Sequence, residues 1–147
     1  MAQKLINLEV VTPERVVSRQ VVRQITLPTT SGEITVLPDH IPLISVLKPG
    51  VIEYKNEDGS QDVMSVSGGF IEVMRDKIVI LADTAEKADE LDEERIKVAL
   101  EKAEKLKSEA QSIDHVEFTA ATIMMEKELA RGRALRRWRR VKGLDRG

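Results

Sequence analysis

The stretch that decides the fold runs from Ser31 to Gly50 and reads SGEITVLPDHIPLISVLKPG. It opens on a Ser-Gly turn signal and the β-branched run Ile34 to Val36, and it closes on a Pro-Gly turn. Two further prolines, Pro38 and Pro42, flank a lone histidine at position 40. Glycine and proline at this density separate short strands by fixed turns. The stretch therefore predicts a β-rich domain.

The rest of the first half has the same character. Short runs rich in β-branched residues fill residues 10–27 and are predicted to end at Pro28. Two hairpins follow, and Asp58-Gly59 supplies the turn of the first. Their predicted strands are residues 51–55, 62–66, 70–74 and 77–81. Strands this short and turns this frequent are typical of an antiparallel sandwich or barrel.

The hydrophobic period changes after Thr84. Apolar residues then recur at helical spacing on one face. That predicted face comprises Leu91, Ala99, Ala103, Leu106, Ala110 and Ile113. The pattern breaks near residue 113, and Asp114 followed three residues later by Glu117 predicts an N-terminal cap. A second helix is predicted from about Val116 to Arg140.

The second predicted helix carries two apolar stripes and can therefore pack against more than one partner. One stripe comprises Phe118, Ala121, Met125, Leu129 and Gly132, and the other comprises Ile123, Ala130 and Ala134. The sequence thus predicts an α+β protein with two domains. Residues 1–85 form an N-terminal antiparallel β-sandwich, and residues 86–147 form a C-terminal α-helical hairpin.

Composition limits the class of protein. At 147 residues the chain makes one ordinary domain or two small ones. It has no cysteine, which excludes disulfides and thiolate metal sites. No apolar run approaches the ~20 residues needed to cross a bilayer, so no membrane insertion is expected. The N-terminus MAQKLINLEVV resembles the start of a strand in a bacterial-type cytosolic protein rather than a targeting peptide.

Charge is unevenly placed, although the net charge is only −2. Residues 86–94 are mostly acidic, whereas arginine dominates residues 131–147. The helix macrodipole favours a C-terminal cation by about 0.3–1 kcal/mol, and only in the last turn. It explains two or three of the six arginines between positions 131 and 140. The excess indicates either contact with an acidic partner surface or a solvated face.

The sequence predicts no catalytic or metal site. The two histidines, His40 and His115, are not spaced for metal ligation or for a Ser/His/Asp arrangement. Asp39 adjoins His40, but neighbours in an extended segment point apart. Gly68-Gly69 fits neither phosphate-binding glycine motif and indicates a turn or a close backbone approach. No cofactor is expected to be required.

Three motifs carry a resemblance to a known family. Residues 31–50 are similar to the β-domain signature of the epsilon subunit of rotary ATP synthases. Residues 66–73, VSGGFIEV, resemble the family's glycine-pair strand connection, and residues 80–86, ILADTAE, resemble its strand-to-helix exit. The resemblance extends in register from about Leu5 to about Arg95 and more loosely beyond. It identifies the chain as a member of the epsilon subunit family of bacterial-type F-type ATP synthases.

The resemblance implies a non-catalytic subunit in the central stalk of a proton-translocating complex. Such a subunit is peripheral to the cell membrane, on its cytoplasmic side. The implied partners are the gamma subunit, the membrane rotor c-ring and, when the hairpin extends, the alpha/beta catalytic hexamer. The sandwich would couple the catalytic head to the ring. The hairpin would alternate between a folded state and an extended state that inhibits ATP hydrolysis.

The same resemblance assigns contacts residue by residue. Gly32-Glu33-Ile34 matches the family's rotor-ring contact, so Glu33 is a candidate polar contact. His40 matches a loop position near gamma and the ring. Both residues could equally serve local structure, and His40 in particular could tie a loop through one ring nitrogen. The arginines implied to reach an acidic surface of beta are Arg136, Arg137, Arg139 and Arg140.

Some members of the family bind ATP where the two helices fold together, through an Ile/Leu-Asp-x-x-Arg-Ala motif. Residues 91–95 resemble it, but Ile96 replaces the alanine and Lys102 stands where arginine is common. The candidate ATP-binding residues are Glu86, Asp92, Arg95, Lys127 and Arg131. The alternative is an acidic first turn that complements a helix N-terminus, with an exposed ion-pair arginine at position 95. Regulatory ATP is therefore a hypothesis.

Two other classes compete with this interpretation. The arginine-rich end could bind nucleic acid, with Trp138 stacking on a base. The tail is short, however, and the β half carries no matching basic stripe, so no nucleic-acid partner is expected. An interfacial membrane helix would need a broad apolar face opposite the arginines. Around them only Ala134, Leu135 and Trp138 are available.

Overall fold

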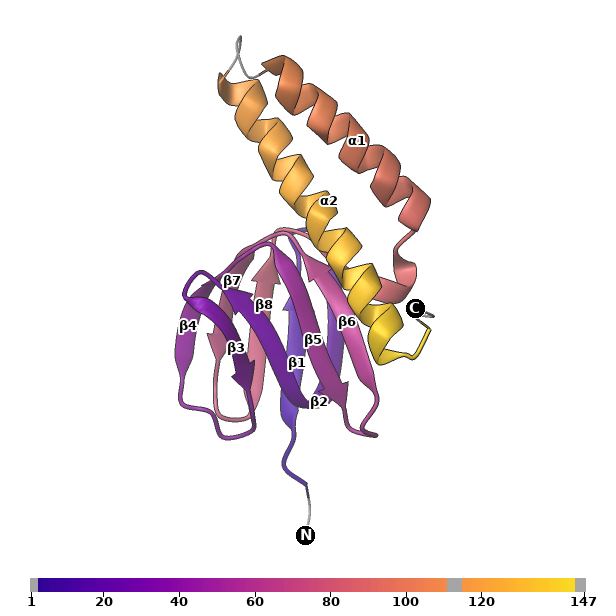
Figure 1. Ribbon diagram of the computed structural model, residues 1–147. Coiled ribbons are helices and arrows are strands. Elements are labelled where there is room, and N and C mark those ends of the chain that lie inside the picture. The colour runs from indigo at the N-terminus through magenta and orange to yellow at the C-terminus, as the bar shows by residue number, and fades with distance from the viewer. Residues whose placement is uncertain (1–2, 111–114, 145–147) are drawn as a thin grey trace.

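The computed structural model describes residues 3–110 and 115–144 of the chain. Nine strands form a β-sandwich, and two helices form a hairpin that extends from one end of it (Figure 1). The strands are β1 Ile6–Val11, β2 Val16–Thr29, β3 Gly32–Val36, β4 Leu43–Leu47, β5 Gly50–Asn56, β6 Gln61–Val66, β7 Gly69–Val73, β8 Lys77–Ala82 and β9 Ala85–Lys87. The helices are the 3₁₀ turn η1 Ala88–Glu90, α1 Glu93–Ala110 and α2 His115–Val141. The predicted α+β class, a β-sandwich followed by a helical hairpin, is confirmed.

Strand β2 connects the two layers of the sandwich. Over its first half it pairs with β1, and over its second half it pairs with β5 on one side and β3 on the other. The strand order β1-β8-β7-β4 continues through β2 to β5-β6-β9. A single pairing, Thr29 with Leu47, joins β4 to β2. Every described pair of strands is antiparallel except β1 with β8, which run parallel.

The core lies between the layers and consists almost wholly of aliphatic side chains. In β1 the alternation is strict, because Ile6, Leu8 and Val10 are buried while Asn7 is exposed and Glu9 is half-buried. The same core includes Val22, Ile25, Leu27, Ile52, Met64, Ile71, Ile78 and Ile80. Burying each such side chain stabilises the fold by about 1.5–3 kcal/mol. In adjacent apolar pairs such as Val21-Val22, one side chain (Val22) is buried in this core and the other (Val21) is half-buried.

The prediction that Pro28 ends a strand is wrong. Strand β2 continues for 14 residues through Pro28. Its pairing with β5 stops at Thr26, so Pro28 lies where one neighbour has already separated from the strand. The carbonyl oxygen of Pro28 still accepts a hydrogen bond from the Lys48 N–H at 2.9 Å. A proline is tolerated there because its missing N–H removes no ladder bond to β5.

The glycine pair marks a close backbone approach, as its sequence indicated. Gly69 begins β7 with a φ of 135°. A Cβ on Gly69 would overlap the carbonyl oxygen of Leu81 and lie 2.9 Å from the Cα of Ala82. The absence of a side chain therefore lets β7 start directly against the end of β8.

The sheet meets the helices at β9 and η1. Strand β9, Ala85–Lys87, pairs with β6, so the sheet continues two residues past the boundary set at residue 85. Helix α1 buries Ile96, Ala103 and Ala110, whereas Leu106 is exposed. Leu106 lies on the predicted apolar face but is exposed, because α1 packs mainly on α2 and hides only a narrow stripe. The predicted cap at Asp114 and the stripe residue Ile113 lie outside the described residues.

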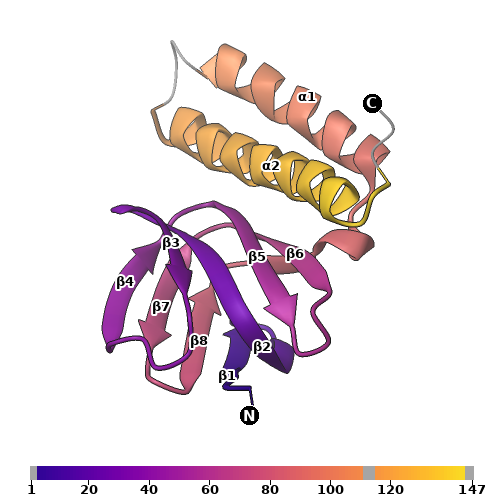
Figure 2. The same ribbon diagram turned by 60° about the horizontal axis from the view of Figure 1, so that its bottom comes forward.

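Helix α2 lies between the sandwich and α1 (Figure 2). Val63 of β6, Ala88 of η1 and Ala134 of α2 are buried together at this contact. Val51, Leu91, Trp138 and Val141 pack around them and are partly buried. The hairpin is thus held by a cluster much smaller than the core of the sandwich. Trp138 is the single tryptophan of the chain, which makes it a natural optical probe of this contact.

Candidate functional site

The basic end of α2 faces acidic residues of the same chain. Arg137 Nε donates a hydrogen bond to Glu53 of β5 at 2.8 Å. Lys142 Nζ lies 3.1 Å from the Asp62 carboxylate of β6. Arg139 donates to Glu93 of α1 at 2.9 Å. Arg136 and Arg140 make no ion pair within the described residues. The four arginines predicted to contact a partner thus divide into two that are paired here and two that are not.

Arg131 is the centre of the most buried ionic group. Its Nε donates to Glu86 Oε1 of β9 at 2.9 Å, its Nη2 donates to the same oxygen, and its Nη1 donates to Glu128 Oε1. Burial alone would lower the pKa of Arg131, but the two carboxylates outweigh that effect and raise it. Because Glu86 belongs to the sheet and Arg131 to α2, this group joins the hairpin to the sandwich.

Glu128 is unusual among the carboxylates of the protein. The residue is 7% exposed, and its second carboxylate oxygen, Oε2, has no hydrogen-bond partner among the described residues. Sequence reasoning missed this residue, because a glutamate on a long charged helix is expected to be exposed to solvent. Its position one turn before Arg131 was the available signal.

The predicted ATP-binding residues only partly converge. A cavity of about 250 Å³ between the helices and β9 is lined by Glu86, Asp92, Arg95 and Arg131, but Lys127 is not among its lining residues. Ile96, Leu91, Ala99, Glu90 and Glu128 also line it. Four carboxylates and two guanidinium groups thus border the cavity. An excess of negative charge disfavours phosphate groups unless cations accompany them.

Asp92 has a local role at the start of α1. Its Oδ1 accepts hydrogen bonds from the N–H groups of Glu94 at 2.9 Å and Arg95 at 3.3 Å. These bonds cap the helix N-terminus. The side chain of Arg95 is 90% exposed and lies 4.0 Å from the Asp92 carboxylate. This geometry favours the acidic-turn interpretation of the motif.

The loop residues assigned by resemblance also show local bonds. Glu33 is exposed near the start of β3 and makes no ion pair within the described residues. His40 is half-buried, and its Nδ1–H donates to the carbonyl oxygen of Ile41 at 2.7 Å. The adjacent Asp39 carboxylate binds Lys4 at 2.5 Å. One ring nitrogen of His40 therefore holds its own loop.

An apolar row crosses the outer face of β4, β7 and β8. Val46 is opposite Phe70, and Phe70 is opposite Leu81, so the three side chains lie side by side. They are 43%, 57% and 53% exposed. Ile44, two residues before Val46 on the same face, is 74% exposed. Sequence reasoning missed this row, because the pairing of distant strands creates it. Contiguous exposed apolar side chains mark contact surfaces.

The described residues include neither a membrane-spanning helix nor a cluster of metal-binding side chains. No helix within residues 3–110 and 115–144 is long and apolar enough to cross a bilayer. In the same part of the chain, no group of three or more His, Cys, Asp or Glu side chains is arranged to hold a metal ion.

These features define a class, a small β-sandwich protein with a helical hairpin held on it by a small apolar cluster and several ion pairs. Residues 5–88 match the family model described as the ATP synthase, Delta/Epsilon chain, beta-sandwich domain. The chain belongs to the ATP synthase epsilon chain family, a family of non-catalytic subunits of F-type ATP synthases.

Individual relatives agree with this assignment. The ATP synthase epsilon chain of Dichelobacter nodosus is 50% identical over 66% of this chain and 68% of its own length. That of Solibacter usitatus is 40% identical over 85% of this chain and 93% of its own length. That of Syntrophomonas wolfei is 38% identical over 91% of this chain and 96% of its own length.

Solved structures show the same architecture. A chain of the Euglena gracilis mitochondrial ATP synthase, from a structure of OSCP, F1 and the c-ring, superposes with a TM-score of 0.77 at 29% identity. The match covers 89% of this chain and 81% of that one. A chain from the central stalk and c-ring of the Tetrahymena thermophila mitochondrial enzyme has a TM-score of 0.58 at 15% identity, which shows the fold alone. It covers 92% of this chain and 99% of that one.

Proposed function

We propose that the protein couples the catalytic head of a proton-translocating F-type ATP synthase to its rotor ring and inhibits ATP hydrolysis through its C-terminal helices. It would act in the central stalk, as a peripheral protein on the cytoplasmic side of the cell membrane. Its partners would be the gamma subunit, the c-ring and, with the hairpin extended, the alpha/beta hexamer.

The observation that carries the regulatory part is the nature of the hairpin contact. Three small or medium side chains, Val63, Ala88 and Ala134, are buried there among partly buried apolar side chains, and ion pairs connect the sandwich to the hairpin beside them. Partly exposed ion pairs contribute about 0–1 kcal/mol each. A contact of this kind can open without unfolding the sandwich, whose core is separate. The hairpin therefore has the properties of a two-state element.

The arginines of α2 then have two alternative sets of partners. In the docked hairpin, Arg137 is bound by Glu53 and Arg139 by Glu93. Extension would release Arg137 from the sandwich, and with Arg136 and Arg140 it could meet an acidic surface of the catalytic hexamer. The ion pairs within the docked chain would thus compete with the contacts that inhibit ATP hydrolysis.

The stalk contacts are proposed on separate surfaces. The apolar row of Val46, Phe70 and Leu81 is suited to a permanent partner such as gamma, since burying it removes large side chains from water. The exposed Glu33 and the loop of His40 offer polar groups suited to the rotor ring. Regulatory ATP at the cavity of Asp92 and Arg95 stays a prediction.

The proposal is tested by ATP hydrolysis in the assembled complex. The full chain is compared with a chain truncated after Glu90, which keeps β9 and η1. We expect faster hydrolysis with the truncated chain and equal retention of both chains in the complex. A Phe70→Glu, Leu81→Glu chain should instead fail to co-purify with gamma. Equal hydrolysis rates for full and truncated chains, both retained, would remove the regulatory function.

A further inference from the structure

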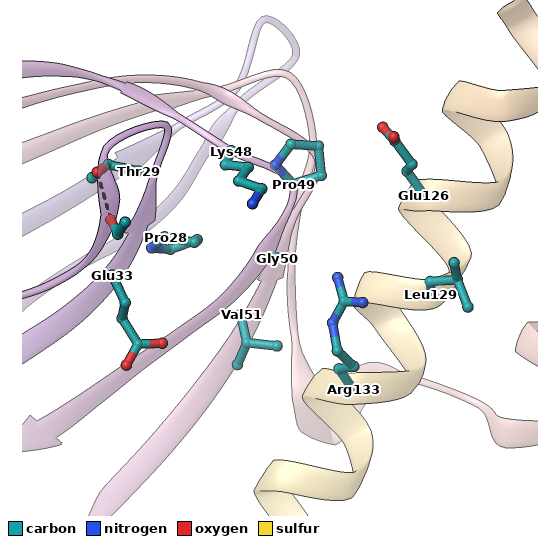
Figure 3. A pocket seen from close by; sticks show the side chains of 11 residues that line it. Pro28, Thr29, Glu33, Lys48, Pro49, Gly50, Val51, Glu126, Leu129 and Arg133 are labelled. Carbon is teal, nitrogen blue, oxygen red and sulfur yellow. Dashed lines mark hydrogen bonds between the residues drawn. The ribbon is translucent and has the colours of Figure 1, made fainter.

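A groove separates β5 from α2 beside the docked hairpin. It contains a cavity of about 730 Å³ between the β2–β3 and β4–β5 turns and the middle of α2 (Figure 3). Pro28, Pro49, Gly50 and Val51 line it on the sheet side, and Leu129 lines it on the helix side. The volume falls within the range of about 300–1,000 Å³ that is usual for ligand sites.

Two unpaired cations enter this groove from opposite walls. Lys48, from the turn before β5, and Arg133, from α2, point their charged ends into the gap above Gly50 (Figure 3). Neither makes an ion pair within the described residues. The carboxylates of Glu33 and Glu126 also line the cavity, and in Figure 3 the Glu33 carboxylate points away from the two cations. The gap is thus bordered by two positively charged hydrogen-bond donors, one from each wall.

A second cavity, of about 380 Å³, continues the groove along α2. It shares Glu33, Val51 and Arg133 with the first cavity. It adds Arg136, Arg137 and Arg140 from the helix, together with Thr26 and Glu53 from the sheet. Arg137 is neutralised by Glu53, which leaves three unpaired arginines at positions 133, 136 and 140. That spacing places them along one side of the helix.

The chemistry of the groove selects a class of ligand. Pro28 and Pro49 have no N–H, so they contribute no backbone donors to this wall, whereas the Lys48 ammonium group contributes a charged one. Guanidinium and ammonium groups together are suited to phosphate oxygens. Seven residues of helix separate Arg133 from Arg140, about 10 Å along the axis. A single phosphate cannot span that distance, whereas a chain of phosphates can.

We propose that this groove binds a phosphate chain, with one phosphate between Lys48 and Arg133 and the following ones directed toward Arg140. The site is separate from the cavity of Asp92 and Arg95 on the other side of α2. Because Lys48 belongs to the sandwich and Arg133 to the hairpin, the bound anion bridges the two parts. Without it, two like charges face each other across the contact. Binding therefore favours the docked hairpin.

Calorimetry of the full chain with inorganic tripolyphosphate tests the proposal. We expect one site, and a Lys48→Gln, Arg133→Gln variant should lose about tenfold in affinity for each cation removed. A matched variant, Arg15→Gln with Arg75→Gln, removes two exposed cations from outside the groove and should bind as the unaltered chain does. Lys48 and Arg133 are both exposed, so their replacement should leave the circular dichroism spectrum unchanged.

Three results would overturn the proposal: no binding at millimolar tripolyphosphate, equal losses in both variants, or no loss in the Lys48, Arg133 variant. Titration of ATP against bound tripolyphosphate then distinguishes the sources of the phosphate chain. Displacement supports a nucleotide source, and its absence supports inorganic polyphosphate. Trp138 emission supplies a second readout. Tripolyphosphate should raise the urea concentration at which this residue becomes exposed in the unaltered chain, and should fail to do so in the variant.

Discussion

Arg137 and Glu53 connect the two parts of the protein, although 84 residues of sequence separate them. The Nε–H of Arg137 donates to a Glu53 carboxylate oxygen at 2.8 Å, and this hydrogen bond raises the pKa of Arg137. The pair lies partly exposed between α2 and β5. An arginine of the C-terminal helix is thus used to hold that helix on its own sandwich.

Replacing Arg137 should therefore release the hairpin. We expect Arg137→Gln to destabilise the docked state by about 0.5–1 kcal/mol, as for other partly exposed pairs. The measurement is the emission of Trp138 during urea titration. Arg140→Gln is the matched control, because Arg140 has no ion-pair partner among the described residues. A Glu53→Gln, Arg137→Gln double-mutant cycle with no coupling energy would contradict the assigned role.

Salt should weaken the docked hairpin. The pairs Glu86–Arg131, Glu53–Arg137 and Asp62–Lys142 all connect the sandwich to the hairpin, the last through the residue that follows α2. The screening length falls from about 10 Å at 0.1 M salt to about 3 Å at 1 M. Trp138 emission should therefore shift toward the exposed value as sodium chloride rises, and less steeply in the Glu53→Gln, Arg137→Gln variant. An identical salt response in both proteins would show that the Glu53–Arg137 pair does not contribute to it, and no loss with salt in either protein would argue for a purely apolar contact.

Nucleotide binding at the helix cavity requires Arg131 to exchange its carboxylate partners for phosphate oxygens. If ATP binds there, Arg95→Ala should weaken binding by about 1 kcal/mol or more, and Glu86→Gln should strengthen it by freeing Arg131. Calorimetry in a Lys48→Gln, Arg133→Gln background excludes the phosphate groove from the signal. Absence of heat at millimolar ATP in that background would leave Asp92 with its capping role alone.

Gly69 should tolerate no side chain. Its φ of 135° and its contact with the backbone of Leu81 predict that Gly69→Ala destabilises the protein by about 3 kcal/mol or more. Gly32 also has a positive φ, of 115°, but no atom lies within 4 Å of a Cβ built there. Gly32→Ala should therefore cost about 1 kcal/mol. Equal free energies of unfolding for the two variants would show that the positive φ, rather than the clash with the backbone of Leu81, determines the loss of stability.

Stability should fall at high pH because of Tyr54. Burial raises the pKa of this phenol above 10.0, Asp62 and Asp89 add to the effect, and Gln20 opposes it. The folded state thus holds the proton more tightly than the unfolded state does. The resulting stabilisation is complete below pH 10 and is lost as the pH rises through the folded-state pKa.

The check uses the single tyrosine of the chain, so phenolate absorbance reports Tyr54 alone. The free energy of unfolding should decline above pH 10 in the unaltered chain and decline less in Tyr54→Phe. Ionisation of Tyr54 at the pKa of free tyrosine in the folded protein would contradict the prediction.

The sequence by itself determined the elements whose signals are local. Turn residues such as Asp58-Gly59 placed the β5–β6 hairpin, and the change of period after Thr84 placed the helices. The glycine pair indicated a turn or a close backbone approach, and the structure shows the close approach at Gly69. Family membership followed from strings of residues that lie close together in the chain.

Tertiary structure alone decided what depends on distant segments. Pro28 remains in a strand because β5 has already separated from β2 at that point, which no local pattern reveals. The apolar row of Val46, Phe70 and Leu81 exists only through the pairing of three strands. The partners of Arg131 and Arg137 lie 45 and 84 residues away. Charges and apolar groups act through space, so their function depends on neighbours that folding, rather than sequence order, brings together.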